Sequence, residues 1–248
     1  MVSQPATAAE IHILHPFLSG QSNARIRVPG VDYCAACRHA AGSGRDFFDF
    51  IPLGGDTLVL AIGHAFGAGT SAALSTVGLQ RLLRSLTAAN CGVISRVVES
   101  MNRAICAVSL DPFYTTLFYG WVDPQRSRLS FVSAAHQPAL LAGNRGTRVR
   151  MLEHTGSVLG LIADGPYRQQ SVSLEPGDVL IALGGVQDQL EGQERAIKIL
   201  REDPDLRAAT LAARILDETG QAVSVVRFEG QEPVELREAS AVAELMAS

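Results

Sequence analysis

The sequence of 248 residues lacks any apolar run that approaches the roughly 18 residues needed to cross a bilayer. It also lacks a block of basic residues, and its formal net charge is −4. The first residues, MVSQPATAAE, have neither the basic nor the apolar region of a secretory signal. These absences argue against a membrane-spanning segment and against nucleic acid as a partner, and we expect a cytoplasmic protein.

Cysteine is scarce, and only Cys34 and Cys37 are close together, in a C-x-x-C spacing that can mark zinc or redox chemistry. A closed zinc site needs two more ligands, usually a second close pair, whereas Cys91 and Cys106 are 15 residues apart. The redox form needs a helix N-terminus, but the residues around Cys34 favour an extended chain. We interpret Cys34 and Cys37 as small buried or edge thiols.

No internal repeat, low-complexity tract or charged linker divides the chain. We therefore expect a single domain over residues 1–248, with a core at about 10–228 and a helical C-terminal extension at 229–248. The apolar share of 47% supports a sizeable core.

Runs of apolar and β-branched residues between turn signals predict strands, and apolar residues spaced by three and four predict helices. The expected strands lie at 31–38, 57–63, 113–123, 128–135, 139–142, 147–152, 168–174, 178–183 and 223–228. The expected helices lie at 6–18, 70–89, 94–108, 192–202, 205–218 and 233–247. Hairpin strands with paired helices between them predict an α+β fold of antiparallel sheets whose outer faces are covered by helices.

The order of six segments resembles the bacterial metal-dependent serine/threonine protein phosphatases of the PPM superfamily, in the stage II sporulation E-like branch. The segments are DFFDF (46–50), LAIG (60–63) before a glycine-rich turn and a long helix, TLFYGWVDPQRSRLSFVSAAHQPALL (116–141), VLGL (158–161), LEPGDVLIAL (174–183) and VSVVRF (223–228). The resemblance covers roughly residues 10–228. It implies a four-layer αββα sandwich of two antiparallel sheets flanked by helices, with a metal site at one end of the sheets.

In this family two Mg²⁺ or Mn²⁺ ions hold a bridging water, which becomes the hydroxide that attacks a phosphoserine. Two divalent ions a few ångströms apart repel each other strongly, so the resemblance implies several carboxylates around them. At the corresponding positions this chain keeps only Asp46. The carboxylate shared by both ions is replaced by His64, the Thr-Asp-Gly after the LEPGD strand reads Leu-Gly-Gly at 183–185, and the paired acids before the last strand read Gln-Ala at 221–222.

The resemblance therefore implies a remnant metal ligand at Asp46, a histidine in place of the bridging aspartate at His64, and degenerate ligand positions at Gly184, Gln221 and Ala222. No intact catalytic residue and no bound cofactor are expected. Asp188 and Asp217 can replace lost ligands only if their loops are re-routed. In isolation, Asp46 and the DFFD sequence around it are more typical of a strand end or turn than of a site.

These observations lead us to expect a pseudophosphatase that binds a regulatory protein in partner-switching signalling. An anti-sigma-factor antagonist or a phosphatase homologue is the expected partner, and a homodimer is possible. The alternative is an active but atypical phosphatase with one metal held by Asp46 and His64 or with new ligands. A structural domain of a larger assembly is a third interpretation.

Overall fold

The computed structural model describes residues 11–14, 28–38, 45–54, 56–67, 70–90, 92–108, 113–185 and 189–230; for 11–14, 70–75, 108 and 189 it describes the backbone only. The strands are β1 (Ile11–Leu14), β2 (Val31–Arg38), β3 (Asp46–Leu53), β4 (Thr57–Phe66), β5 (Tyr114–Asp123), β6 (Arg128–Ala134), β7 (Ala139–Gly143), β8 (Arg148–Leu152), β9 (Gln170–Ser173), β10 (Val179–Leu183) and β11 (Val223–Phe228). The helices are α1 (Thr70–Ala89), α2 (Ile94–Val108), α3 (Gln189–Glu202) and α4 (Ala208–Thr219). None of the described helices is both long and apolar enough to cross a membrane.

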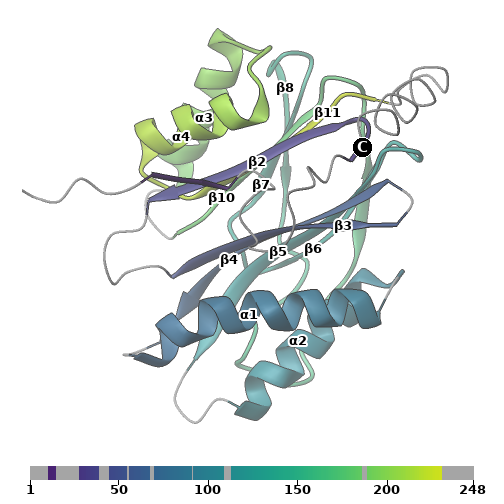
Figure 1. Cartoon of the computed structure of the whole chain (residues 1–248), viewed down its shortest axis with the longest axis vertical. Helices are drawn as coiled ribbons and strands as arrows, with labels where there is room; N and C mark the ends of the chain where they lie inside the picture. The colour runs from purple at the N-terminus through teal and green to yellow at the C-terminus, as the bar shows by residue number, and fades with distance from the viewer. Residues whose placement is uncertain are drawn as a thin grey trace, which may run out of the picture.

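The strands form two sheets in which every pairing is antiparallel. Sheet A has the order β1-β2-β11-β10-β7-β8, and sheet B has the order β3-β4-β5-β6-β9. Figure 1 shows the sheets stacked face to face, with α3 and α4 outside sheet A and α1 and α2 outside sheet B. The predicted α+β fold, an αββα sandwich of two antiparallel sheets, is confirmed.

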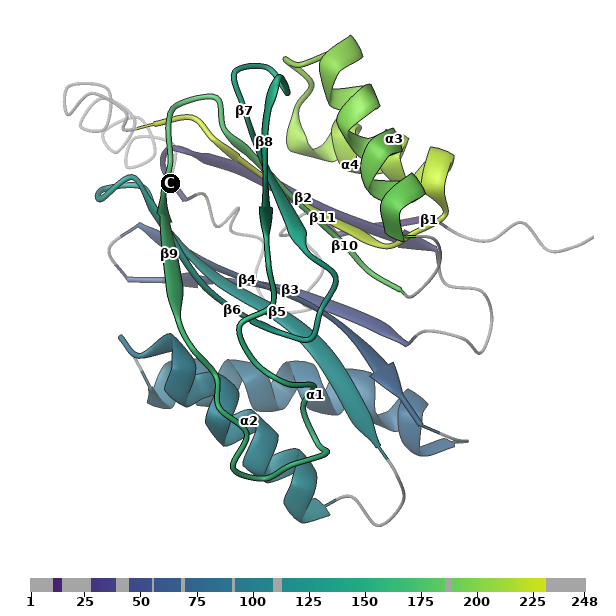
Figure 2. The ribbon, with the colours of Figure 1, turned by 180° about the vertical axis from the view of Figure 1, so that it is seen from behind.

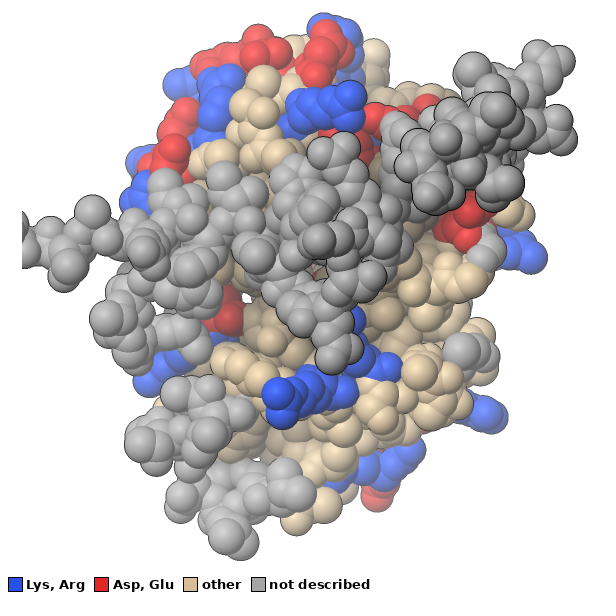
Figure 3. Space-filling model, in the orientation of Figure 1, with Lys and Arg blue, Asp and Glu red and all other residues tan. Residues whose placement is uncertain are grey.

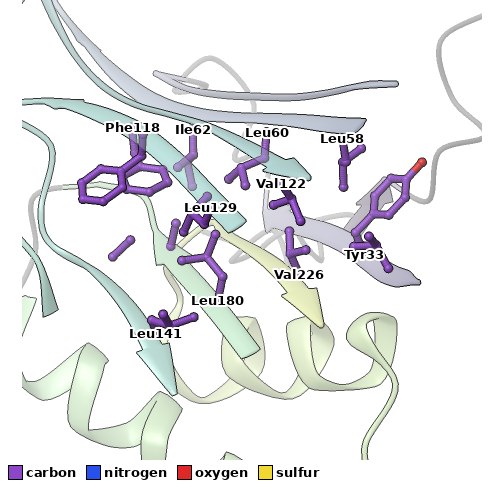
Figure 4. Close-up of a cluster of buried hydrophobic side chains, with 14 of the residues drawn as sticks. Tyr33, Leu58, Leu60, Ile62, Phe118, Val122, Leu129, Leu141, Leu180 and Val226 are labelled. Carbon is purple, nitrogen blue, oxygen red and sulfur yellow. The ribbon is translucent and has the colours of Figure 1, made fainter. Parts of the chain in front are cut away.

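Both sheets bury both of their faces, as β10 illustrates. All five of its residues are buried. Leu180 and Ala182 join the apolar core between the sheets, whereas Val179, Ile181 and Leu183 join the core beneath α3 and α4. This alternation is the period-two pattern of a strand. Figure 4 shows the inter-sheet core, where Leu180 and Val226 of sheet A face side chains of sheet B.

Two strands were not foreseen from the sequence. The helix expected at 6–18 is wrong over Ile11–Leu14, which forms β1 and pairs with β2. The edge of β2 supplies the hydrogen-bond partners for this strand, and local residue periodicity cannot reveal such a partner. No strand was predicted at β3, whose Asp-Phe-Phe-Asp start was interpreted as a strand end or turn, yet β3 pairs with β4 along its whole length. The helix expected at 233–247 lies outside the described residues.

Cys34 and Cys37 lie on β2 three residues apart, so their side chains point to opposite faces of sheet A. Cys34 belongs to the core beneath α3 and α4, and Cys37 belongs to the inter-sheet core. Burial raises the pKa of Cys34 to about 12 and that of Cys37 to about 11. This placement excludes a metal ion shared by the two thiols, and the prediction of buried thiols is confirmed.

The connection from β6 to β7 carries the chain from sheet B to sheet A, and His136 ties the two sheets together there. His136 is 2% exposed, and its Nε2 lies 3.0 Å from the carbonyl oxygen of Leu183 on β10. Since a carbonyl only accepts hydrogen bonds, Nε2 carries the proton, and Nδ1 accepts from the hydroxyl of Thr116, at 3.1 Å. Burial disfavours the charged ring and lowers the pKa of His136 to about 4.

The low pKa of His136 makes stability depend on pH. In the unfolded chain the ring takes up a proton below its ordinary pKa of 6.5, whereas in the folded protein it stays neutral down to about pH 4. The free energy of unfolding therefore falls as the pH drops through this window, by about 2 kcal/mol between pH 7 and pH 5 from this group alone.

Urea denaturation of the wild type and of His136→Gln at both pH values measures this contribution. The variant should be less stable at pH 7 but should lose less stability on acidification. An equal loss in the two proteins would show that His136 is not held neutral by the fold.

Candidate active site

A row of polar side chains closes one end of the inter-sheet core. Asp46, His64 and Thr116 are direct cross-strand neighbours on β3, β4 and β5. Two residues further along each strand, the inter-sheet core begins with Phe48, Ile62 and Phe118. Because strand side chains alternate between faces, the three polar residues point into the same space between the sheets. The row therefore lies at the sheet end where the family resemblance places the metal site.

Asp46 is held by two donors. The Nδ1 atom of His64 lies 2.8 Å from its Oδ1, and the backbone N–H of Gly185 donates to the same oxygen at 2.9 Å. The side chains of His64 and Asp46 are 11% and 27% exposed. With Nδ1 directed at a carboxylate, His64 presents only Nε2 to any other group. One oxygen of the Asp46 carboxylate is thus already hydrogen-bonded within the protein.

Sheet A contributes small residues that fit against Asp46. A Cβ atom placed on Gly184 would lie 2.9 Å from Asp46 Oδ1 and 3.1 Å from the Cβ of Ala222. The backbone N–H of Gly184 also donates to the carbonyl of Ala222 at 2.7 Å. The structure therefore brings together Asp46, His64, Gly184 and Ala222, four of the five positions selected from the sequence.

The fifth position, Gln221, points the other way. Ala222 belongs to the inter-sheet core. The Gln221 side chain instead packs on α3, where its Cδ would lie 3.1 Å from a Cβ atom on Gly192. Only one residue of the pair at 221–222 can therefore face Asp46. Strand alternation in the sequence could have shown this.

Other carboxylates considered from the sequence do not join the row. Asp49 is buried on β3 and accepts two hydrogen bonds from the guanidinium of Arg84 on α1, at 2.7 and 2.6 Å. Burial raises the pKa of Asp49, and the Arg84 charge opposes that shift. Asp217 is paired with Arg38 at 2.7 Å. Asp188 lies outside the described residues.

Sequence reasoning missed Thr116, which belongs to the row, and Gln137, which supports it. Thr116 stands between His64 and His136, and its partnership with the His136 ring depends on the strand register. Gln137 donates through Nε2 to the carbonyl oxygens of Leu183 and Gly184, and the contact with Gly184 measures 3.3 Å. His136 and Gln137 thus fix the backbone at the end of β10, next to Asp46.

The described residues do not fit a two-metal centre. Among them, no group of three or more His, Cys, Asp and Glu side chains can hold a metal ion. The row offers one carboxylate, Asp46, and its Oδ1 already accepts two hydrogen bonds. Two divalent ions a few ångströms apart need several carboxylates to offset their repulsion.

The sequence is similar to two phosphoserine phosphatases of Bacillus subtilis. The chain is 26% identical to phosphoserine phosphatase RsbU of Bacillus subtilis over 136 residues, which is 55% of the chain and 40% of that protein. It is 28% identical to phosphoserine phosphatase RsbP of Bacillus subtilis over 155 residues, which is 60% of the chain and 38% of that protein. The chain thus spans less than half the length of these curated relatives.

A solved structure with a similar fold comprises the RsbU and RsbW domains of Rv1364c from Mycobacterium tuberculosis. It superimposes with a TM-score of 0.66 at 24% sequence identity, covering 83% of this chain and 62% of that one. The profile of stage II sporulation protein E matches residues 54–233, nearly three quarters of the sequence. The matched region contains β4 to β11 and every helix described above. The chain belongs to the stage II sporulation protein E (SpoIIE) family of PPM phosphatase domains.

Proposed function

We propose that this domain is a pseudophosphatase, which binds a regulatory phosphoprotein in bacterial partner-switching signalling without hydrolysing its phosphoserine. One observation carries the proposal. Where the resemblance implies a set of metal-binding carboxylates, the chain has a hydrogen-bonded Asp46–His64 pair backed by Gly184 and Ala222.

The chemistry of the row supports binding over hydrolysis. Phosphoserine hydrolysis in this family requires a metal-activated hydroxide and positive charge near the phosphate oxygens. A neutral imidazole offers one lone pair and cannot bridge two ions as a carboxylate does. His64 also directs Nδ1 at Asp46, which leaves a single nitrogen for any other role. The remaining row member, Thr116, is hydrogen-bonded to His136.

The relatives support the class of partner. Two of them are named phosphoserine phosphatases, RsbU and RsbP, and the similar solved structure contains an RsbW domain beside an RsbU domain. We therefore propose a serine-phosphorylated regulatory protein, such as an anti-sigma-factor antagonist, as the partner. Association with a phosphatase homologue or with a second copy of the chain belongs to the same proposal, because a retained phosphatase surface can compete for or recruit active relatives.

The domain should not turn over phosphate esters. Hydrolysis of p-nitrophenyl phosphate and of a phosphoserine peptide should stay at background in the presence of Mg²⁺ or Mn²⁺. Asp46→Ala should leave that background unchanged. Asp205→Ala serves as a control, since it removes an exposed carboxylate that is paired with Arg145. Robust metal-dependent turnover that Asp46→Ala abolishes and Asp205→Ala preserves would show an atypical active enzyme instead.

Another prediction concerns the space beside Asp46. Gly184→Asp puts a carboxylate where even a Cβ atom is only 2.9 Å from Asp46 Oδ1, so crowding and charge repulsion should lower the free energy of unfolding by at least about 2 kcal/mol. A Cβ atom on exposed Gly54 would meet nothing within 4 Å, and Gly54→Asp should be nearly neutral. Urea denaturation in EDTA measures both.

Gly184→Asp, alone and in a triple variant, tests whether added carboxylates let the fold bind Mn²⁺. Mn²⁺ should not restore the stability of Gly184→Asp alone. It should stabilise the triple variant His64→Asp, Gly184→Asp, Ala222→Asp, because these carboxylates would face Asp46 together and bound metal stabilises the folded state. Equal stabilisation of the wild type by Mn²⁺ would show that the unaltered row already binds the metal.

A further inference from the structure

β8 is an edge strand of sheet A, and among the described residues only β7 pairs with it. Four of its five residues are exposed. Figure 2 shows the β7–β8 hairpin on the side of sheet A away from β1. An unpaired edge presents a row of backbone N–H and C=O groups that can pair with another chain.

The side chains of β8 alternate in character. Arg148 and Arg150 point to one face, while Val149 and Met151 point to the other. Val149 and Met151 are 36% and 42% exposed, which places them among the few large apolar side chains at the described surface. Both lie opposite β7 residues that are buried beneath α3, so they extend that apolar layer outwards to the edge.

The charge of Arg150 is not balanced within the described structure. Arg148 contacts Glu175 Oε2 at 2.7 Å and Asp178 Oδ1 at 3.2 Å. Arg150 forms no ion pair with any described carboxylate. On α3, by contrast, acidic and basic side chains alternate and pair, as Glu191 does with Arg195. Figure 3 shows this mixture of charges over α3 and α4.

We propose that β8 is a docking site for an extended segment of another protein in which acidic side chains alternate with apolar ones. Such a segment would add to sheet A as a further strand. Its acidic side chains would lie across from Arg150 and its apolar side chains beside Val149 and Met151, and cross-strand pairs of both kinds stabilise a sheet. The backbone supplies affinity and the alternating side chains supply selectivity.

The same charges disfavour a second copy of this chain as the occupant. Two β8 strands paired antiparallel about a two-fold axis at Val149 would bring Arg148 of each copy opposite Arg150 of the other, and like charges opposite each other destabilise a sheet. Arginine on an edge strand commonly protects against such self-association. The arginines of β8 disfavour only the second copy, because their positive charge repels the same arginines on that copy but attracts an acidic strand.

The test uses a fluorescein-labelled peptide in which glutamate and valine alternate, with binding followed by fluorescence anisotropy. The wild type should bind it, and Arg150→Glu should weaken binding by about tenfold or more. Raising NaCl to about 1 M, where the Debye length is near 3 Å, should also weaken it. Arg96→Glu is the matched control: it reverses another exposed arginine, on α2 in the opposite layer, and should leave binding unchanged.

Two further peptides separate strand addition from simple charge attraction. One peptide is N-methylated on every glutamate and the other on every valine, so the methyl groups lie along opposite edges of the extended peptide. Only the peptide whose methyl groups face β8 loses its hydrogen-bond donors to that strand, and its side chains are unchanged. That peptide should lose binding. Equal binding of both methylated peptides, absence of binding to the wild type, equal effects of Arg150→Glu and Arg96→Glu, or a β8-mediated homodimer would each overturn the proposal.

Discussion

The hydrogen bond between Asp46 and His64 is the contact on which the account of the site depends. It joins β3 to β4 where the apolar core between the sheets ends, and the Gly185 N–H adds a second donor to the same oxygen. A Cβ on Gly184 would lie 2.9 Å from Asp46 Oδ1, so any side chain at this position would crowd the carboxylate. These contacts make Asp46, His64, Gly184 and Gly185 a closely packed polar cluster.

The scaffold can keep its fold while this end changes, because the fold does not rest on the row. Each sheet is buried on both faces, with one core between the sheets and one beneath each helical pair. The polar row occupies only the rim of the inter-sheet core, with His136 and Gln137 fixing the end of β10 beside it. Substitution at the rim therefore leaves the apolar contacts of the sandwich in place.

Much of the fold could be predicted from the sequence, since apolar runs between turn signals gave most strands and the spacing of leucines and valines gave the helices. β3 was not predicted as a strand because its Asp-Phe-Phe-Asp start is typical of a strand end or turn. β1 was not predicted because its partner strand is distant in sequence. At the site, the resemblance selected positions that converge in space. The opposite directions of Gln221 and Ala222 could have been read from strand alternation. The partnership of Thr116 with His136 could not, because it depends on register and on a crossover between sheets.

We propose that the row does not hold a pair of divalent ions. Electron paramagnetic resonance of Mn²⁺ titrated with the protein tests it most directly, since bound Mn²⁺ loses the sharp signal of the aqueous ion and a bound pair shows spin coupling. The account predicts that the aqueous signal persists at equimolar protein and metal. Loss of that signal with a spin-coupled pair in the wild type, reversed by Asp46→Ala, would contradict it.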